Sequence, residues 1–389
     1  MLSPAEGART LLSDGPVLVF LLALFLFADA LEAAGALDHL ARWLVGRTRS
    51  AAGVPALIFV GFGIATMFLL NDAMVVIGVP VLIGLAARMR TDARTLLLPL
   101  AFAVTVGSVA TPFGNPQNLL VATQSGIPSP TVTFLRYLLL PTVVNLAVGA
   151  VYVHWRYARR MTGEGFEALR ASAPPLLPAR LGGRIRSSPV LVLFPVTIVA
   201  IIASDIVGAF GLAPPVPSWA IAGAGTLALL AASPGRQRIV TTVSWRVLLL
   251  FAGLFVVVAG AVAGGVIPGV ERFLPIPHPG PPLVDIAGVT AASLVGPQLF
   301  SNVPWVGLQI SLLGSLGYGA STPIAWMALA GVSTLAGNVT LLGAASNLIV
   351  AELAEEQGIS IRLVPFVRDA LPLAAISVGV LVGFLLVGL

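Results

Sequence analysis

Apolar segments close to the length of a membrane span follow one another along almost the whole chain. A hydrocarbon core of about 30 Å takes about 20 helical residues to cross, because each residue advances a helix by about 1.5 Å. Of the 389 residues, 57% are hydrophobic and 10% are charged, which is too few polar side chains to cover a soluble protein of this size. The sequence therefore predicts an all-α polytopic membrane protein. The predicted segments are residues 15–36, 54–70, 73–88, 95–123, 131–153, 188–208, 216–233, 247–267, 284–300, 303–317, 323–351 and 370–389.

The basic residues are all arginines, and their distribution predicts an orientation. Of the 21 arginines, 18 fall in loops on one side of the membrane when these segments are threaded through it. The positive-inside rule assigns such loops to the cytoplasm. The sequence thus predicts a multi-pass protein of the cytoplasmic (inner) membrane. The basic stretch 154–187 is its cytoplasmic linker, and no nucleic acid is expected as a partner.

Two pairs of segments are joined by only two polar residues. The arms of the first pair are about 24–26 Å long, short of the roughly 30 Å core, and the second pair poses the same choice: each pair is either a tight transmembrane hairpin or a re-entrant hairpin with its tip inside the membrane. The pairs are 54–70 with 73–88, joined at Asn71-Asp72, and 284–300 with 303–317, joined at Ser301-Asn302.

An internal repeat favours the re-entrant hairpins. When Thr111 is aligned with Thr340, TPFGNPQNLLVA (111–122) lies on TLLGAASNLIVA (340–351), with six of twelve positions identical. A shift two positions longer places Asn71 on Asn302. The arginines give the two repeats opposite directions across the membrane, and inverted repeats are a known transporter architecture.

The polar stretch inside each matched sequence predicts a broken helix. Proline removes a backbone donor, and hydrocarbon offers no water to replace it, so irregular backbone at this depth must be buried or line a cavity. The segments 95–123 and 323–351 are therefore expected to be interrupted at the middle of the membrane.

The repeat also predicts the domain organisation. Segments 188–208 and 216–233 precede the second repeat and nothing equivalent precedes the first, so either two helices have been lost or the true start lies upstream. The predicted units are a scaffold in two parts (1–50 and 188–282), a transport domain in two parts (51–153 and 283–389) and the linker 154–187.

Two breaks and two hairpin tips are expected to meet and form the site. Half-helix N-termini favour an anion and unwound carbonyls favour Na⁺, while amides can donate to a substrate or accept from a cation. The alternative is that these polar side chains only hold helices together. The predicted substrate-binding residues are Asn71, Thr111, Gly114, Asn115, Asn118, Ser301, Asn302, Thr340, Gly343 and Asn347.

These motifs resemble those of the ion transporter superfamily, which includes sodium-coupled dicarboxylate and citrate transporters, arsenite permeases and sodium/proton antiporters. The resemblance covers residues 15–389 and rests on NDA and TPFGNPQN in the first half, and on SNVP and AGNVTLLGAASNLIVAE in the second. It implies an elevator mechanism, a homodimer, and a role for Asn71 and Asn302 at the hairpin tips. The dicarboxylate branch has Ser-Asn-Thr at both tips, and neither threonine is present here, which makes a dicarboxylate substrate doubtful.

Asp72 is the main departure from the family pattern, because its repeat partner is Val303. An acid inside the membrane is costly unless it is paired, protonated or ion-bound. Asp72 is therefore predicted to carry the coupling proton or, with Asn71 and Asn302, to bind Na⁺. The alternative is a tip that reaches water and a solvated carboxylate.

The sequence predicts a secondary transporter for a small anion or oxyanion, driven by H⁺ or Na⁺ and without a further cofactor. An arsenite or Na⁺/H⁺ efflux antiporter is the alternative. The chain contains no G-x-x-x-x-G-K-[ST], HExxH or GxSxG motif and no cysteine, so an enzyme is not expected.

Overall fold

The computed structural model describes residues 3–161, 165–171, 188–243, 245–273 and 279–388, and in these ranges the backbone forms helices, turns and loops without a β-strand. Seven helices within them are long and apolar enough to cross a membrane, which confirms the predicted fold class.

The first repeat contains α2 (Gly15–Ala33), α3 (Ala36–Arg47), α4 (Val54–Thr66), α5 (Asn71–Arg88), α6 (Arg94–Gly107), α7 (Pro116–Gln124), α8 (Pro130–Phe134) and α9 (Leu140–Tyr157). The second repeat contains α15 (Trp245–Ala263), α16 (Val266–Phe273), α17 (Pro282–Phe300), α18 (Asn302–Leu316), α19 (Pro323–Ala336), α20 (Ala345–Glu356) and α21 (Leu363–Val387). The remaining α-helices of the described residues are α1 (Pro4–Ser13), α10 (Phe166–Ala171), α12 (Val190–Ala209), α13 (Ser218–Ala232) and α14 (Arg236–Thr242).

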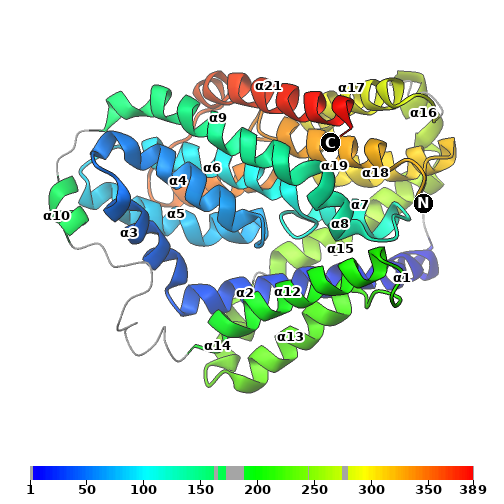
Figure 1. Cartoon of the computed structure of the whole chain (residues 1–389), viewed down its shortest axis with the longest axis horizontal. Helices are drawn as coiled ribbons and strands as arrows, with labels where there is room; N and C mark the ends of the chain where they lie inside the picture. The colour runs from blue at the N-terminus through cyan, green and yellow to red at the C-terminus, as the bar shows by residue number, and fades with distance from the viewer. Residues whose placement is uncertain (1–2, 162–164, 172–187, 244, 274–278, 389) are drawn as a thin grey trace.

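The helices fall into two groups (Figure 1). Helices α12, α13, α14 and α15 each pack on α2, and α12 also packs on α13. In the second group, α4 packs on α6 and α9, α17 packs on α19, and α21 packs on α9 and α19. The second group carries both breaks and both hairpins.

Helix boundaries confirm the inverted repeat. Helices α6 and α19 have the same length. The number of residues from the start of α6 to the start of α19 equals the number from the start of α7 to the start of α20. Helices α5 and α18 begin at the matched asparagines of the two hairpin tips, Asn71 and Asn302. Figure 1 shows α9 running toward the end of the molecule where α10 lies, while α21 runs away from that end.

The tips of both hairpins end inside the protein, as the predicted re-entrant hairpins require. Asn71 and Asn302 are buried, and Asp72 is only 2% exposed. This near-complete enclosure by protein argues against the alternative of a freely solvated Asp72 carboxylate. The first hairpin approaches the broken helix closely at two glycines: a Cβ added to Gly107 would overlap the carbonyl oxygen of Gly63. Small residues allow this approach of α4 and α6, as is usual between membrane helices.

Several predicted boundaries were wrong. Helices α1, α3, α14 and α16 were not predicted, since each is shorter than a span and carries polar residues on one side. Helix α9 continues to Tyr157, inside the predicted linker, of which residues 162–164 and 172–187 lie outside the described residues. Helix α21 begins at Leu363 rather than at residue 370, because the charge of Asp369 is balanced by arginines of the α9 region.

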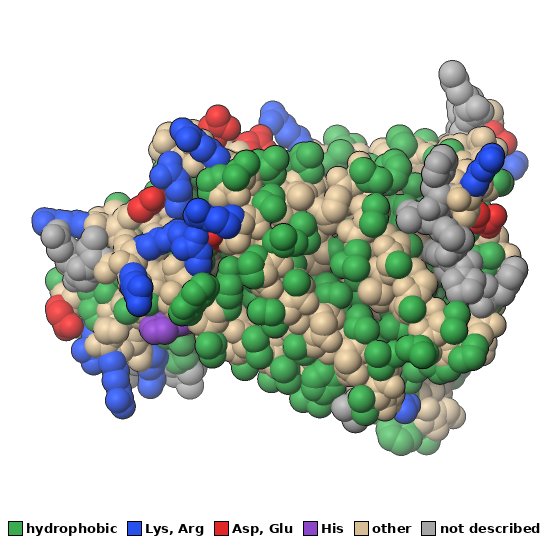
Figure 2. Space-filling model, turned by 90° about the horizontal axis from the view of Figure 1, so that it is seen from above, with side chains coloured by type: hydrophobic (Ala, Val, Ile, Leu, Met, Phe, Trp, Pro, Cys, Tyr) green, Lys and Arg blue, Asp and Glu red, His purple; other side chains and the backbone are tan. Residues whose placement is uncertain are grey.

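Arginines gather at one end of the molecule, seen at the left of Figure 2, and an apolar belt covers its middle. This arginine-rich end is formed where α5 ends, α6 begins, α9 ends and α21 begins. Contacts tie these termini together: Arg94 Nε donates to the Ser360 carbonyl at 2.8 Å, and Thr91 Oγ1 donates to the Arg160 carbonyl at 3.4 Å. The arginine-rich end includes Arg88, Arg90, Arg94, Arg156, Arg159, Arg160, Arg362 and Arg368.

Candidate functional site

The break between α6 and α7 is held open by asparagine amides. Asn118 Nδ2 donates to the carbonyls of Ser108 (3.0 Å), Val109 (3.3 Å) and Thr111 (3.1 Å). Asn115 caps α7, since its Oδ1 accepts from the Asn118 backbone N–H at 2.8 Å. These bonds satisfy carbonyls that the interrupted helix leaves free, which a break inside a membrane requires.

The break between α19 and α20 has the same construction. Asn347 Nδ2 donates to the carbonyls of Gly337 (3.0 Å) and Thr340 (3.2 Å). These acceptors are the repeat partners of Ser108 and Thr111, so one clamp occurs twice. The predicted register therefore holds at the level of individual hydrogen bonds.

Each hairpin tip rests on the break of its own repeat. The Asn71 backbone N–H donates to the Gly114 carbonyl at 2.8 Å. In the second repeat, Gly337 lies against the tip, because a Cβ added there would come within 3.2 Å of Asn302 Nδ2. The matched threonines of the two breaks each bond to the hairpin of their own repeat. Thr111 Oγ1 donates to the Met67 carbonyl, and Thr340 Oγ1 donates to Gln298 Oε1 at 2.8 Å.

Ser301 gives the second tip a strained backbone. Its φ of 63° and ψ of 160° lie in a region that almost only glycine adopts. Leu70, its counterpart in the first repeat, has φ −52° and ψ 132°. Backbone strain of this kind is common in functional sites, and here it occurs at only one of the two tips.

Thr334 joins the two repeats at the centre of the site. Its Oγ1 accepts from Asn115 Nδ2 (3.4 Å) and Gln117 Nε2 (3.2 Å) and lies 3.3 Å from Asn118 Oδ1, to which it can donate. A second link runs from Asn71 Nδ2 to Ser346 Oγ at 3.4 Å. Tips and breaks that are far apart in the sequence thus form one buried polar core.

Replacing Thr334 with Val is expected to destabilise the protein by about 1–3 kcal/mol, because a buried donor of Gln117 loses the partner that it has in the described structure. Ser333→Ala is the matched control, since among the described residues the Ser333 hydroxyl bonds only to carbonyls of its own helix. Thermal unfolding in detergent measures the difference. Equal melting temperatures for the two variants would contradict a stabilising link between the repeats.

The predicted site residues did not include five members of the polar core: Gln117, Gln298, Thr334, Asn338 and Ser346. Thr334 could have been found, since Thr105 occupies the matching position in the first repeat. Asn338 lies on Val109 in the same register, so the repeat contains no signal for it.

Asp72 lies in the first turn of α5, beside this core, and its carboxylate has no hydrogen-bond or ion-pair partner among the described residues. Its backbone N–H donates to Asn71 Oδ1 at 2.9 Å. The N-terminal end of a helix stabilises nearby negative charge, but a buried unpaired carboxylate still favours a proton or a cation.

Two further acceptors are open in the second break. Within the described residues, the buried Oδ1 atoms of Asn338 and Asn347 have no hydrogen-bond partner. The amide group of Asn338 donates to the Phe102 carbonyl at 3.3 Å, which leaves its oxygen as the available atom. Amide oxygens of this kind accept from donors or contact a cation.

Two cavities adjoin the polar core and do not contain its asparagines. One, of about 410 Å³, is lined by Pro112 and Phe113 of the first break and by α2 and the loop before α13. The other, of about 440 Å³, is lined by Val303 and Pro304 of the second tip and by α15. Both include Asp14 and Gln124, which are hydrogen-bonded at 3.0 Å, so the hollow follows the boundary between the two helix groups.

A buried polar core between two inverted membrane repeats is the architecture of secondary transporters. The comparison with known families agrees: the family described as Citrate transporter matches residues 10–334. The chain belongs to the citrate transporter family. It is a multi-pass membrane transporter and not an enzyme.

Relatives extend over most of the chain. An uncharacterized transporter of Mycobacterium tuberculosis is 27% identical over 377 residues, covering 94% of this chain and 84% of the relative. The silicon efflux transporter LSI3 of Oryza sativa is 26% identical over 391 residues, covering 88% and 79%. The solved structure of MtrF from Neisseria gonorrhoeae, described as an antimetabolite efflux pump, aligns with a TM-score of 0.56 and 16% identity over 98% of this chain and 84% of that chain. The likeness to MtrF shows the fold alone.

Proposed function

We propose that this chain is a secondary active transporter that moves a small anion or oxyanion, coupled to H⁺ or Na⁺. The observation that carries the proposal is the pair of matching tip-and-break units beside an unpaired buried carboxylate, Asp72. The tip-and-break units suit the substrate, and Asp72 suits the coupling ion.

The substrate would bind where the two half-helices α7 and α20 begin. Their N-termini carry partial positive charge, and the amide groups of Asn71 and Gln117 add donors. Among the described residues, no arginine contributes to the polar core, so an anion would be held by dipoles and amides. The predicted residues from Asn71 to Asn347 remain our proposal for this site.

The coupling ion would bind on the acidic side of the core. Asp72 can take a proton, or it can bind Na⁺ together with oxygens of Asn71 and Asn302. The open Oδ1 atoms of Asn338 and Asn347 offer a second place for a cation. Ion binding at unwound helices is the usual arrangement in inverted-repeat transporters.

We further propose an elevator movement in which residues 51–153 and 283–389 slide against a scaffold of 1–50 and 188–282. The cavities between the two helix groups support this, because a moving boundary has to be loosely packed. The arginine-rich end and the linker 154–187 would face the cytoplasm. A homodimer through the scaffold would cover part of α15, whose apolar span is only 11% buried in the monomer.

The alternative is efflux of a neutral hydroxylated species, such as arsenite or silicic acid, or of Na⁺, in exchange for protons at Asp72. The silicon efflux relative, which matches over 88% of this chain, supports this alternative.

Uptake into proteoliposomes under separately imposed proton and sodium gradients tests the proposal. The panel is citrate, succinate, sulfate, phosphate, arsenite, silicic acid and Na⁺. We expect one anion to accumulate only under a gradient. If no anion moves while arsenite, silicic acid or Na⁺ exchanges for protons, the alternative is correct. If nothing moves under any gradient, both are wrong.

A further inference from the structure

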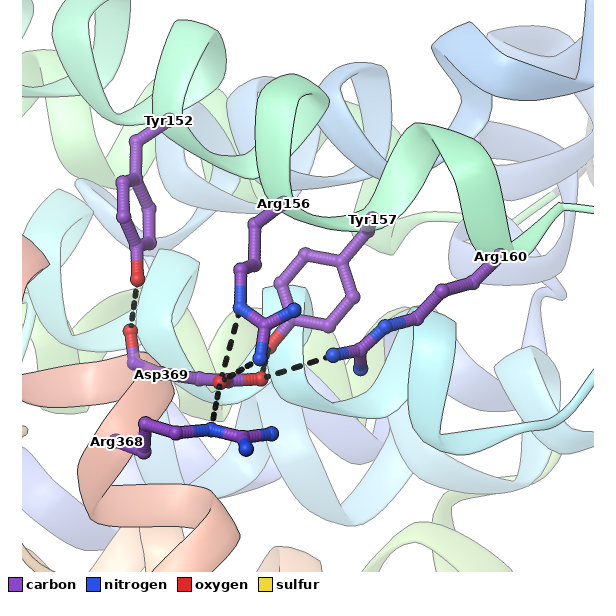
Figure 3. A network of polar contacts seen from close by, with 6 residues as sticks. All are labelled: Tyr152, Arg156, Tyr157, Arg160, Arg368 and Asp369. Atoms are coloured by element: carbon purple, nitrogen blue, oxygen red, sulfur yellow. Dashed lines mark hydrogen bonds and ion pairs between the residues drawn. The ribbon is translucent and has the colours of Figure 1, made fainter.

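Asp369 is the centre of a polar network that joins α9 and α21 at the arginine-rich end (Figure 3). The residue is 1% exposed. Its Oδ1 accepts from Arg156 Nη2 (2.6 Å) and Nε (3.0 Å), and its Oδ2 accepts from the Tyr157 hydroxyl at 3.0 Å. The Tyr152 hydroxyl donates to its backbone carbonyl at 2.7 Å.

The network holds more positive than negative charge. Arg160 and Arg368 also approach the carboxylate, at 3.8 and 3.6 Å. Within the described residues, Asp369 is the only acid paired with these three arginines, so about two positive charges are left unbalanced. Arg160 and Arg368 are beyond hydrogen-bond distance of the carboxylate, so their N–H groups remain available to a second anion.

The surplus charge lies where the apolar belt ends. The side chain of Arg368 is 68% exposed. Val364 and Leu371, four residues before it and three after it on the same face of α21, are exposed apolar residues. On α9, Trp155 is 72% exposed and Val151 lies one turn away from it, also exposed. An exposed tryptophan beside exposed arginines is typical of the level at which lipid headgroups meet acyl chains.

We propose that Arg160 and Arg368 bind the phosphate of an anionic phospholipid headgroup, with the acyl chains lying on the apolar faces that carry Trp155 and Leu371. Arg156 holds Asp369 and thereby keeps α9 and α21 together beneath the headgroup. Guanidinium groups suit this role because they bind phosphate oxygens in a bidentate manner. A lipid fits better than a free phosphate, because the apolar surface next to the arginines needs an apolar partner.

Binding of phosphatidylglycerol to the full-length protein in detergent tests the proposal, with native mass spectrometry for affinity and thermal unfolding for stability. We expect phosphatidylglycerol, and neither phosphatidylcholine nor inorganic phosphate, to bind and to raise the melting temperature. An arginine at an anionic membrane surface contributes about 1 kcal/mol, so Arg368→Gln should weaken binding about fivefold, and Arg160→Gln with Arg368→Gln about 25-fold.

Arg170→Gln is the matched control, because Arg170 is also an exposed arginine but pairs with one acid, Glu167, at 3.8 Å. It should bind phosphatidylglycerol like the wild type. Arg368→Gln alone is the variant to rely on if the double variant unfolds, since the exposed Arg368 adds little to packing. Wild-type affinity in Arg368→Gln would overturn the proposal. An equal effect of inorganic phosphate would also overturn it, since the site would then take a free anion.

Discussion

Asp72→Asn should abolish the stimulation of transport by an ion gradient while leaving the protein folded. Asn has the shape of Asp but carries neither a charge nor an exchangeable acidic proton, and the Asp72 carboxylate has no protein partner to lose among the described residues. Coupling between two bound ligands is typically about 1–3 kcal/mol, so substrate affinity should fall by about 5–150-fold and no longer respond to the driving ion.

Uptake into proteoliposomes measures this effect, with initial rates taken with and without the proton or sodium gradient. Asp92→Asn is the control, since Asp92 is exposed and pairs with Arg94 at 3.3 Å at the arginine-rich end. It should transport like the wild type. If Asp72→Asn still accumulates substrate against a gradient, Asp72 is not the coupling group, and the open oxygens of Asn338 and Asn347 become the next residues to replace.

The sequence could predict the repeat and the tip-and-break arrangement because both depend on local signals. Proline, glycine and asparagine interrupt an apolar run, and identical residues recur in one register, so the sequence alone pairs Asn118 with Asn347. What the sequence did not contain is how these amides are used. Their NH₂ groups bind the unwound carbonyls, and the oxygen of Asn347 is the part that remains open.

Contacts between distant segments account for what was missed. Thr334 becomes central only when the second repeat is folded against the first. The last apolar segment was predicted to begin at residue 370, just after Asp369, because an isolated acid usually lies outside the membrane. Arg156, which belongs to the first repeat and lies far from Asp369 in the sequence, balances it and allows α21 to begin earlier. A pattern within one segment cannot reveal a partner of that kind.

The two repeats share a backbone arrangement but differ in their side chains. The first contributes an acid at its tip, and the oxygens of its tip and break asparagines, Asn71, Asn115 and Asn118, are bonded. The second has a strained Ser301 at its tip and two asparagine oxygens without partners among the described residues. An exact symmetry would give two equal sites. The observed difference fits a transporter in which the two halves contribute differently to binding the substrate and the coupling ion.

Gly114→Ala should destabilise the first break and stop transport. A Cβ at this position would overlap the carbonyl oxygen of Ser108 and lie 2.5 Å from its Cα, and backbone atoms cannot move aside as a side chain can. That same carbonyl accepts from Asn115 and Asn118, so shifting it breaks the clamp that holds α6 and α7 apart. Overpacking of this kind costs about 1–3 kcal/mol or more.

Two other glycines make the result specific. Gly343 is the repeat partner of Gly114, and its added Cβ would lie 2.6 Å from the Gly337 carbonyl oxygen, so Gly343→Ala should have a smaller effect of the same kind. Gly84 in α5 has no atom within 4 Å of an added Cβ, so Gly84→Ala should be neutral or stabilise the helix by about 0.5–1 kcal/mol. Melting temperatures and uptake rates should therefore rank Gly84→Ala above Gly343→Ala and Gly343→Ala above Gly114→Ala. Wild-type stability and uptake in Gly114→Ala would mean that the break can reshape around a methyl group, and the clamp would then not be the rigid element on which the proposed site depends.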